Sequence, residues 1–323
     1  MDARITIAIV LGGPGLFIAA IIGGLIVRFL RGCRRADQVW TAAHYPKLKG
    51  TGTVKHLTIL PLIDRHTARA DLAGEAGVSY LVQADDTTIL FDLGLNQRGE
   101  HPSPLLRNMQ ALGMSLDRVD CIVISHPHLD HVGGMGYERK HTFDPSGERI
   151  DLGRMLAFVP EPMTHPTARV QVVDGPRVLV PGVATLGPIY RQLFFFGWTP
   201  EQSLAVNVKD KGIVLIIGCG HSTLQRIVER AEMLFDEPIY GMVGGLHYPV
   251  TALPVQRLLG TGNWPWAPIN KKDVEASIAY LQRRHPQLVA LSPHDSCNWS
   301  IEAFRRAFGD ACREVLVGQE IIV

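Results

Sequence analysis

The stretch "VISHPHLDHVGGM", residues 123–135, constrains the fold of this chain more than any other feature. Directly after an apolar run that ends at Ile124, four side chains that can bind metal fall within six positions: His126, His128, Asp130 and His131. Crowded histidines repel one another when protonated, so the arrangement is unfavourable unless something binds them. Imidazole together with carboxylate suits zinc, iron or manganese. The stretch therefore predicts a metal site on a loop at the end of a buried strand.

The spacing of these side chains indicates two neighbouring metal positions. In an extended segment, His126 and His128 project towards the same side and can address one centre. The chain then turns at the glycines that follow, so Asp130 and His131 can reach a second centre close by.

The apolar pattern from about residue 53 onwards predicts two strand-rich halves. In the first, "VKHLTILPLI" and "VSYLVQADDTTILFDLG" are typical of strands, the second forming a hairpin, and "PLLRNMQALGM" has helical spacing. In the second, strands such as "IVLIIG" alternate with helices such as "STLQRIVERAEML". We therefore expect sheet packed on sheet with helices outside, a four-layer αββα sandwich of the α/β class (α+β type), over residues 53–323.

The N-terminal stretch 5–27, "ITIAIVLGGPGLFIAAIIGGLIV", carries no charge over 23 residues. As a helix it is long enough to cross a hydrocarbon core of about 30 Å. The basic run "RFLRGCRR" follows it, whereas a cleaved signal peptide, the alternative, carries its basic residues first. The positive-inside tendency places the following chain in the cytoplasm. We expect an anchor over 1–30, a basic linker over 31–52, and a single-pass membrane protein with a cytoplasmic catalytic domain.

Charge and cysteine content argue against two other classes of protein. The formal net charge is +1, and since the first 50 residues are basic, the remainder is mildly acidic. Such a domain binds nucleic acid poorly, so we expect a small-molecule substrate. Among the five cysteines there is no pair at the spacing of a zinc knuckle or redox motif. Cys121 and Cys219 lie in or beside apolar runs and are expected to be small buried hydrophobes.

The segment "SHPHLDHVGG" resembles the H-x-H-x-D-H motif of the metallo-β-lactamase superfamily, and the likeness extends over about residues 53–323. Upstream, "TILFDLG" resembles the first motif of that superfamily, in which Asp92 would hold the metal loop without touching metal. The resemblance implies the αββα fold and one or two divalent metal ions per chain. Zinc is the first expectation, and manganese or iron would also suit the site.

Four further segments resemble the dihydropteroate-synthase-like branch, which includes the archaeal ribofuranosylaminobenzene 5'-phosphate synthases. They are "AGVSYLV", "GIVLIIGCGHSTL", "MVGGLHY" and "SPHDSCN". Carried onto this chain, the motifs of the branch make His221 and His294 the outlying metal ligands. His247 becomes a pocket residue, either a substrate contact beside the metal or a histidine packed under the following Tyr248 and Pro249. From the residues alone, "GCGHS" could also be a turn capped by Ser222.

The chain departs from the wider superfamily at one position. Dinuclear members have an aspartate that bridges two metals after a strand resembling "IVLIIG", and this chain has Gly218-Cys219 there. No bridging carboxylate is visible, so the number of metals stays open.

These features predict a membrane-anchored, metal-dependent hydrolase. Its site would place one metal at His126, His128 and His221, and a second at, or flanked by, Asp130, His131 and His294. A bound metal lowers the pKa of its water to about 7, which would give a hydroxide nucleophile for an ester, lactone or phosphoester-type substrate. Asp130 is the expected catalytic residue, as a ligand or as the acceptor of the nucleophile's proton.

Two alternatives follow from the same residues. One is a pterin-pathway transferase like the branch just named, which would couple a pterin pyrophosphate to an aromatic amine and use the metals to stabilise the departing diphosphate. The other is a membrane-tethered module that binds a ligand. The loop "GNWPWAPIN" could cover an apolar substrate with Trp264 and Trp266, or could pack on its own domain.

Overall fold

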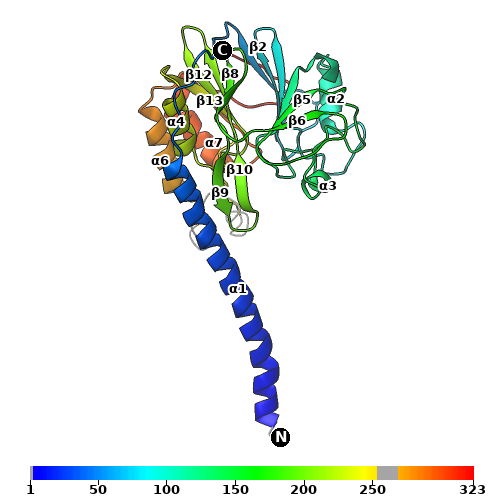
Figure 1. Ribbon diagram of the computed structural model, residues 1–323, viewed down its shortest axis with the longest axis vertical. Coiled ribbons are helices and arrows are strands. Elements are labelled where there is room, and N and C mark those ends of the chain that lie inside the picture. Colours follow the sequence, from blue (N-terminus) through cyan, green and yellow to red (C-terminus); the bar gives the residue numbers. More distant parts are fainter. Residues whose placement is uncertain (1–2, 253–267) are drawn as a thin grey trace.

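The computed structural model describes residues 3–252 and 268–323 and has the layered architecture that the sequence predicted (Figure 1). Two sheets pack face to face, with helices on both outer sides. Trp264 and Trp266, the two tryptophans expected to cover a substrate, lie outside the described residues.

The first sheet has seven strands in the order β15-β1-β2-β3-β4-β5-β6. Strands β1 (Leu57–Ile63), β2 (Ser79–Ala84) and β3 (Thr87–Phe91) are antiparallel, and the C-terminal β15 (Ile321–Ile322) pairs with β1. From β3 onwards the neighbours are parallel: β4 (Cys121–Val123), β5 (Leu156–Val159) and β6 (Arg169–Val172). The predicted hairpin is present, with Ala84 opposite Thr87.

The second sheet has six strands in the order β14-β13-β12-β11-β8-β7. Strands β7 (Arg177–Val180), β8 (Val183–Thr185), β11 (Leu204–Val208) and β12 (Gly212–Ile217) form an antiparallel half. Strands β12, β13 (Ile239–Gly244) and β14 (Leu288–Leu291) are parallel. Between β8 and β11, a separate hairpin consists of β9 (Ile189–Leu193) and β10 (Gly197–Glu201).

The helices lie on the outer faces of the two sheets. Helix α2 (Pro104–Ala111) covers the first sheet, and the short helix α3 (Met135–Glu138) follows the histidine loop. The second sheet is covered by α4 (Leu224–Leu234), α6 (Lys271–Gln282) and α7 (Asn298–Phe308). Two short 3-10 helices complete the described elements, at Leu116–Arg118 and Gly309–Ala311.

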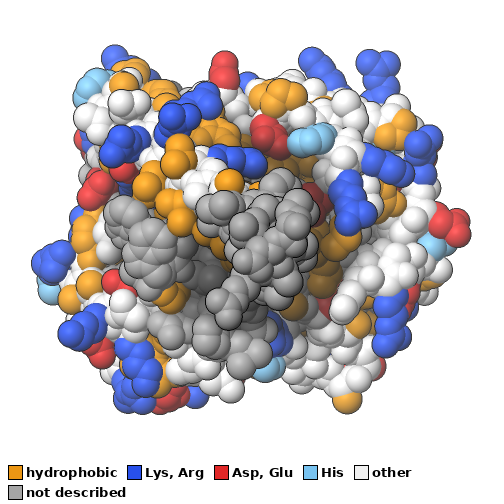
Figure 2. All heavy atoms as spheres, turned by 90° about the horizontal axis from the view of Figure 1, so that it is seen from below, with side chains coloured by type: hydrophobic (Ala, Val, Ile, Leu, Met, Phe, Trp, Pro, Cys, Tyr) orange, Lys and Arg blue, Asp and Glu red, His pale blue; other side chains and the backbone are white. Residues whose placement is uncertain are grey.

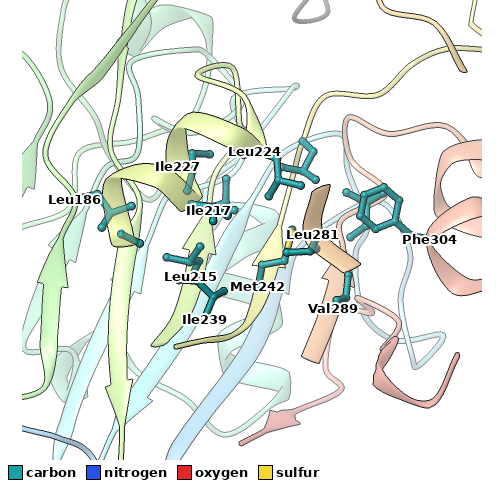
Figure 3. Packing of buried hydrophobic residues seen from close by; sticks show 14 of the residues in the cluster. Leu186, Leu215, Ile217, Leu224, Ile227, Ile239, Met242, Leu281, Val289 and Phe304 are labelled. Carbon is teal, nitrogen blue, oxygen red and sulfur yellow. The ribbon is translucent and has the colours of Figure 1, made fainter. Parts of the chain in front are cut away.

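Three apolar clusters fill the spaces between these four layers. One lies between the two sheets, another between the first sheet and α2, and the third between the second sheet and its helices. Figure 3 shows the third, where Leu224 and Ile227 of α4 face Leu215 of β12 and Phe304 of α7 lies near Val289 of β14. Burying a side chain of this size stabilises the fold by about 1.5–3 kcal/mol. The clusters hold both sheets as rigid supports for the loops at their ends.

The N-terminal helix α1 (Ala3–Ala42) is one continuous element that projects away from the sandwich (Figure 1). Its C-terminal part packs on the β9–β10 hairpin. Phe29, only 2% exposed, meets the ring of Phe194 edge-on with centroids 5.6 Å apart. Further along the helix, the guanidinium of Arg35 lies 4.5 Å from the ring centroid of Trp198. This end of α1 is therefore part of the folded domain.

The structure corrects two predictions for this region. No helix within the described residues has the length and apolarity needed to span a membrane, so the transmembrane segment over 5–27 and the single-pass membrane location with a cytoplasmic domain are wrong. The physical reason is that the apolar stretch does not end as a separate span. It continues without a break into a charged helical part that packs on protein. Residues 31–42, expected in a linker, belong to that helix.

The face from which α1 projects carries apolar and basic side chains side by side. Figure 2 views this face from below and shows lysine and arginine side chains over its outer parts with hydrophobic ones between them. The exposed large hydrophobic residues of the helix and of the hairpin tip are Ile21, Ile22, Leu25, Val27, Val39, Phe195 and Phe196.

Candidate metal centre

The predicted ligands follow the ends of strands from both sheets. In the first sheet, Asp92 follows β3 and His126 follows the parallel strand β4. In the second, parallel strands β12 and β14 are followed by His221 and His294. Because the carboxyl ends of parallel strands meet at one edge of a sheet, these loops converge. The fold thus explains why residues far apart in sequence meet at one site.

Two glycines let the loops approach closely. A Cβ on Gly218, directly after β12, would lie 2.3 Å from the Oγ of Ser125. A Cβ on Gly245, directly after β13, would lie 2.6 Å from Cε1 of His294. Since real Cβ atoms are not found this close to other heavy atoms, only glycine fits at either position. The "GCG" and "GG" elements of the sequence are therefore needed for the convergence.

The first group of candidate ligands consists of His126, His128 and His221. One ring nitrogen from each lies within 4.8 Å of the others. Within the described part of the chain, Nε2 of His126 and both ring nitrogens of His221 have no hydrogen-bond partner, although the two residues are 0% and 1% exposed. Leaving a buried polar atom unpaired costs about 1–3 kcal/mol. A cation bound between the rings would supply the missing partner.

The second group consists of Asp130, His131, Cys219 and His294, whose ligand atoms also lie within 4.8 Å of one another. Nε2 of His131 is 3.5 Å from Oδ2 of Asp130. The Sγ of Cys219 lies 3.1 Å from Nε2 of His131 and 3.2 Å from Nε2 of His294. The structure thus brings together the residues predicted for the second metal and adds Cys219 to them.

Asp92 takes the position expected of it, beside the ligands. Its Oδ2 is 2.7 Å from Nδ1 of His131, and its Oδ1 accepts the backbone N–H of Ser125 at 2.6 Å. The hydroxyl of Ser125 donates to Asp92 at 2.6 Å and lies 2.9 Å from Nδ1 of His126. Engaging Nδ1 in this way leaves Nε2 of both histidines directed at the candidate metal positions.

His294 is held by a similar relay from the other sheet. Its Nδ1 is 2.6 Å from the hydroxyl of Ser292, which donates to Oδ2 of the buried Asp64 at 2.6 Å. Asp64 lies directly after β1 and also accepts the hydroxyl of Tyr80 at 3.1 Å. Because Nδ1 of His294 is engaged, its Nε2 is free to face the second group of candidate ligands.

The Glu201 carboxylate holds the loop that follows β12. Glu201 is only 1% exposed. Its Oε1 accepts the backbone N–H groups of Gly220 at 2.7 Å and Cys219 at 3.0 Å, and its Oε2 accepts the backbone N–H of Ser222 at 3.3 Å. Sequence reasoning missed Glu201, because a glutamate at the end of a strand is ordinary until the loop that it contacts is known. It also assigned Cys219 to the apolar core. The signal available for Cys219 was its place where the superfamily has a bridging aspartate.

Burial keeps most of the imidazoles neutral, which is the form that binds metal. It lowers the pKa of His126, His221 and His294 well below the ordinary value, and neighbouring histidines lower it further. Burial likewise lowers the pKa of His128 to about 4. Asp130 is the opposite case. Although burial alone would raise its pKa, the adjacent His131 holds it below the usual range, so the carboxylate is ionised.

His247 lies beside the first group, as a pocket residue should. Its ring centroid is 4.8 Å from that of His221, and one of its nitrogens joins Cys219 and His221 in a third set within 4.8 Å. Its backbone N–H donates to Oδ2 of Asp295 at 2.8 Å. This place is compatible with the substrate contact beside the metal that was expected as one of its two roles.

The donor set fits divalent metal ions. Imidazoles, one carboxylate and one thiol are the ligand types of zinc and of other first-row ions. The unpaired nitrogens of His126 and His221 point to a cation rather than to a closed hydrogen-bond network.

Comparison with known proteins agrees with this geometry. The family model of the metallo-beta-lactamase superfamily matches residues 72–201, a range that holds the H-x-H-x-D-H motif and ends with β10. The chain therefore carries a metallo-beta-lactamase superfamily domain, and the αββα sandwich is the fold of that superfamily. The resemblance found in the sequence is confirmed.

The proteins similar to this chain include a hydrolase and a synthase. The solved structure of Tm1679, a metal-dependent hydrolase of the beta-lactamase superfamily, superposes with a TM-score of 0.61 at 21% identity, over 83% of this chain and 99% of that one. The metallo-beta-lactamase fold protein YhfI from Bacillus subtilis superposes with a TM-score of 0.52 at 12% identity, over 83% of this chain and 100% of that one. The 7,8-dihydropterin-6-methyl-4-(beta-D-ribofuranosyl)-aminobenzene-5'-phosphate synthase of Methanocaldococcus jannaschii is 24% identical over 62% of this chain and 80% of its own length.

Proposed function

We propose that this protein is a metal-dependent hydrolase that acts on an ester, lactone or phosphoester bond of a small molecule. The observation that carries the proposal is the set of buried imidazole nitrogens of His126 and His221 that have no hydrogen-bond partner within the described residues, in two rings whose centroids are 4.9 Å apart. The second group, around His131, adds a further set of candidate ligands within 4.8 Å of one another. The match to the metallo-beta-lactamase superfamily supports the same reading, since Tm1679 is a metal-dependent hydrolase of that superfamily.

Divalent metal ions, when bound, would polarise the bond under attack and activate a water molecule. The residues of the chain supply the rest. Asp130 is ionised and its side chain is 25% exposed, so it can accept a proton at a carboxylate oxygen on the open side of the site. Asp92 and Ser125 orient the imidazoles of His126 and His131 so that their Nε2 atoms face inwards. Fixed ligands of this kind need little rearrangement during the reaction.

A transferase is the second candidate, and one observation favours it. The relative from Methanocaldococcus jannaschii is a synthase, and the likeness covers 80% of its length. In that case the same ligands would serve to stabilise a leaving group, and a second substrate would take the place of water.

The test is a metal and activity measurement on the full chain. Metal-loaded protein is assayed with phosphodiesters, lactones and esters, with and without an aromatic amine and a pterin pyrophosphate. Asp130→Asn is expected to lower turnover by about 10²–10⁴-fold, since it removes a proton acceptor. His141→Ala, which changes an exposed histidine away from both groups, is the matched control. Turnover only in the presence of the amine would favour the transferase, and activity that survives chelation and metal-free preparation would refute both.

A further inference from the structure

The hairpin formed by β9 and β10 lies against the candidate metal centre. The ring of Phe196, in the turn between the two strands, has its centroid 4.7 Å from that of His128 and is tilted by 37° to it. Farther along β10, the hydroxyl oxygen of Thr199 is 3.5 Å from Nε2 of His128. The hairpin is therefore in direct contact with one of the candidate ligands of the first group.

Two aromatic rings of this turn are open to solvent. Phe195 is 56% exposed and Phe196 is 41% exposed. Exposed apolar side chains that are scattered singly over a surface are ordinary. These two are adjacent, and Phe196 is continuous with the candidate metal centre through its contact with His128. An apolar group of a bound molecule would gain free energy by covering them, because apolar surface would leave water.

The C-terminal part of α1 holds the hairpin in this position, and Figure 1 shows the two elements side by side. Phe29 of α1 packs edge-on against Phe194, the residue that precedes the two exposed rings. A Cβ on Gly32 would lie 2.5 Å from Cγ of Gln192, a buried side chain of β9, so a larger residue at position 32 would push the helix and the hairpin apart. A turn fixed in this way needs little ordering when a ligand binds.

We propose that Phe195 and Phe196 form an apolar wall at the mouth of the metal centre and select esters or lactones that carry an aliphatic acyl chain. The inference rests on the proposed metal-dependent function and names the substrate class of that site. Because the turn 194–196 consists of three phenylalanines, it offers a bound group no side-chain hydrogen bond, which disfavours a charged or strongly polar substituent there. Gly32 is a positioning residue that acts through the hairpin.

The test measures binding of straight-chain carboxylates, from acetate to decanoate, to the zinc-loaded full chain by titration calorimetry. In the wild type, each added methylene should lower the Kd by about 2–4-fold until the wall is covered. Phe196→Ala should remove most of this dependence and leave acetate binding unchanged, whereas Phe196→Leu should keep most of it. Gly32→Leu should act like Phe196→Ala although it changes no residue of the wall. Ile322→Ala, which changes an exposed apolar residue of β15, is the matched control and should bind like the wild type.

The p-nitrophenyl esters of the same acids separate binding from chemistry. Phe196→Ala and Gly32→Leu should raise KM for the octanoate ester and leave kcat unchanged, because the wall contacts the acyl chain equally before and during the reaction. Kinetic constants for the acetate ester should not change in either variant.

The outcomes separate this inference from the hydrolase proposal. Carboxylate affinity that is independent of chain length in the wild type, or a dependence that survives in Phe196→Ala, would overturn the wall and leave the hydrolase proposal intact. Binding that depends on chain length and on Phe196, without turnover of any ester, would support the wall and contradict the hydrolase. A protein that binds neither zinc nor any carboxylate would overturn both.

Two further measurements keep the test decisive. If Phe196→Ala converts a dimer into a monomer in analytical ultracentrifugation and leaves carboxylate binding unchanged, the rings pack on a second copy of the chain and the proposal is overturned. Circular dichroism establishes that each variant is folded. If Gly32→Leu does not fold, Arg35→Ala, which removes the contact of α1 with Trp198, tests the same role of the helix. A folded helix variant that binds decanoate like the wild type would overturn that role.

Discussion

Asp64 offers the sharpest quantitative prediction, because a fully buried carboxyl couples stability to pH. It is 0% exposed, and its partners are the hydroxyls of Ser292 and Tyr80 and the backbone N–H of Arg65. Burial raises its pKa from 3.8 to about 7, and the hydrogen bonds and the charge of Arg65 offset only part of that rise. The proton is therefore held far more tightly in the folded chain than in the unfolded one.

The sign and size of the effect follow from the two pKa values. Above pH 3.8 the unfolded carboxyl has lost its proton, while the folded one keeps it until about pH 7. In this interval the folded state binds more protons, so stability falls as pH rises. For one such group, linkage gives a loss of roughly 2–3 kcal/mol between pH 5 and pH 8. Asp64→Asn has no proton to lose and should escape this loss.

Urea unfolding of the metal-stripped protein at pH 5 and pH 8 measures the effect without interference from metal binding. The free energy of unfolding of Asp64→Asn, relative to wild type, should rise by roughly 2–3 kcal/mol between the two pH values. Asp86→Asn, which changes an exposed aspartate in a turn, is the control and should show no such rise. If the Asp64→Asn difference changes by less than about 0.5 kcal/mol, the size expected of an ordinary surface substitution, the reasoning about this carboxyl is refuted.

Three further outcomes are expected. Glu201→Ala leaves three buried N–H groups without their acceptor and should lower the free energy of unfolding by about 3 kcal/mol or more. Glu201→Gln should lower it by less, and equal losses for the two variants in urea titrations would contradict the role given to the carboxylate. Burial alone would raise the pKa of Cys297, but hydrogen bonds with Ser300 and Thr251 lower it to about 7. Burial raises the pKa of Cys33 and Cys312. Mass spectrometry after brief iodoacetamide treatment at pH 7.5 should therefore find Cys297 labelled before the other two. Zinc at a hundred times its dissociation constant should stabilise the chain by about 2.7 kcal/mol, visible as a rise in melting temperature that a chelator reverses; an unchanged melting temperature would argue against a folded-state metal site.

Local pattern was enough for several parts of this protein. The apolar run before His126 and the glycines after His131 located a strand end with candidate metal ligands, and the hairpin near Asp85 followed from alternating residues around a polar turn. His221 and His294 came from resemblance to a known branch, since a lone histidine after a strand has no meaning by itself.

Other parts depended on contacts that no local pattern contains. An uncharged stretch in the N-terminal region looks the same whether it ends as a separate span or continues into a helix that packs on protein, and the contact of Phe29 with Phe194 is what distinguishes the two. The pKa of Asp64 is raised by burial in the folded domain, and its hydrogen-bond partner Ser292, which offsets part of that rise, lies 228 residues further along the chain.

The sequence by itself indicated a metal site at the end of a buried strand, because ligand types and their spacing within one loop are local properties. Only the tertiary structure decided which distant residues complete the site. Cys219 is a small apolar residue in the context of its own strand, and becomes a candidate ligand when strand pairing brings it 3.1 Å from His131 and 3.2 Å from His294. The physical reason is that the periodicity of a strand records which side of it is buried, whereas the position of its end relative to other strands is set by pairing and packing across the whole domain.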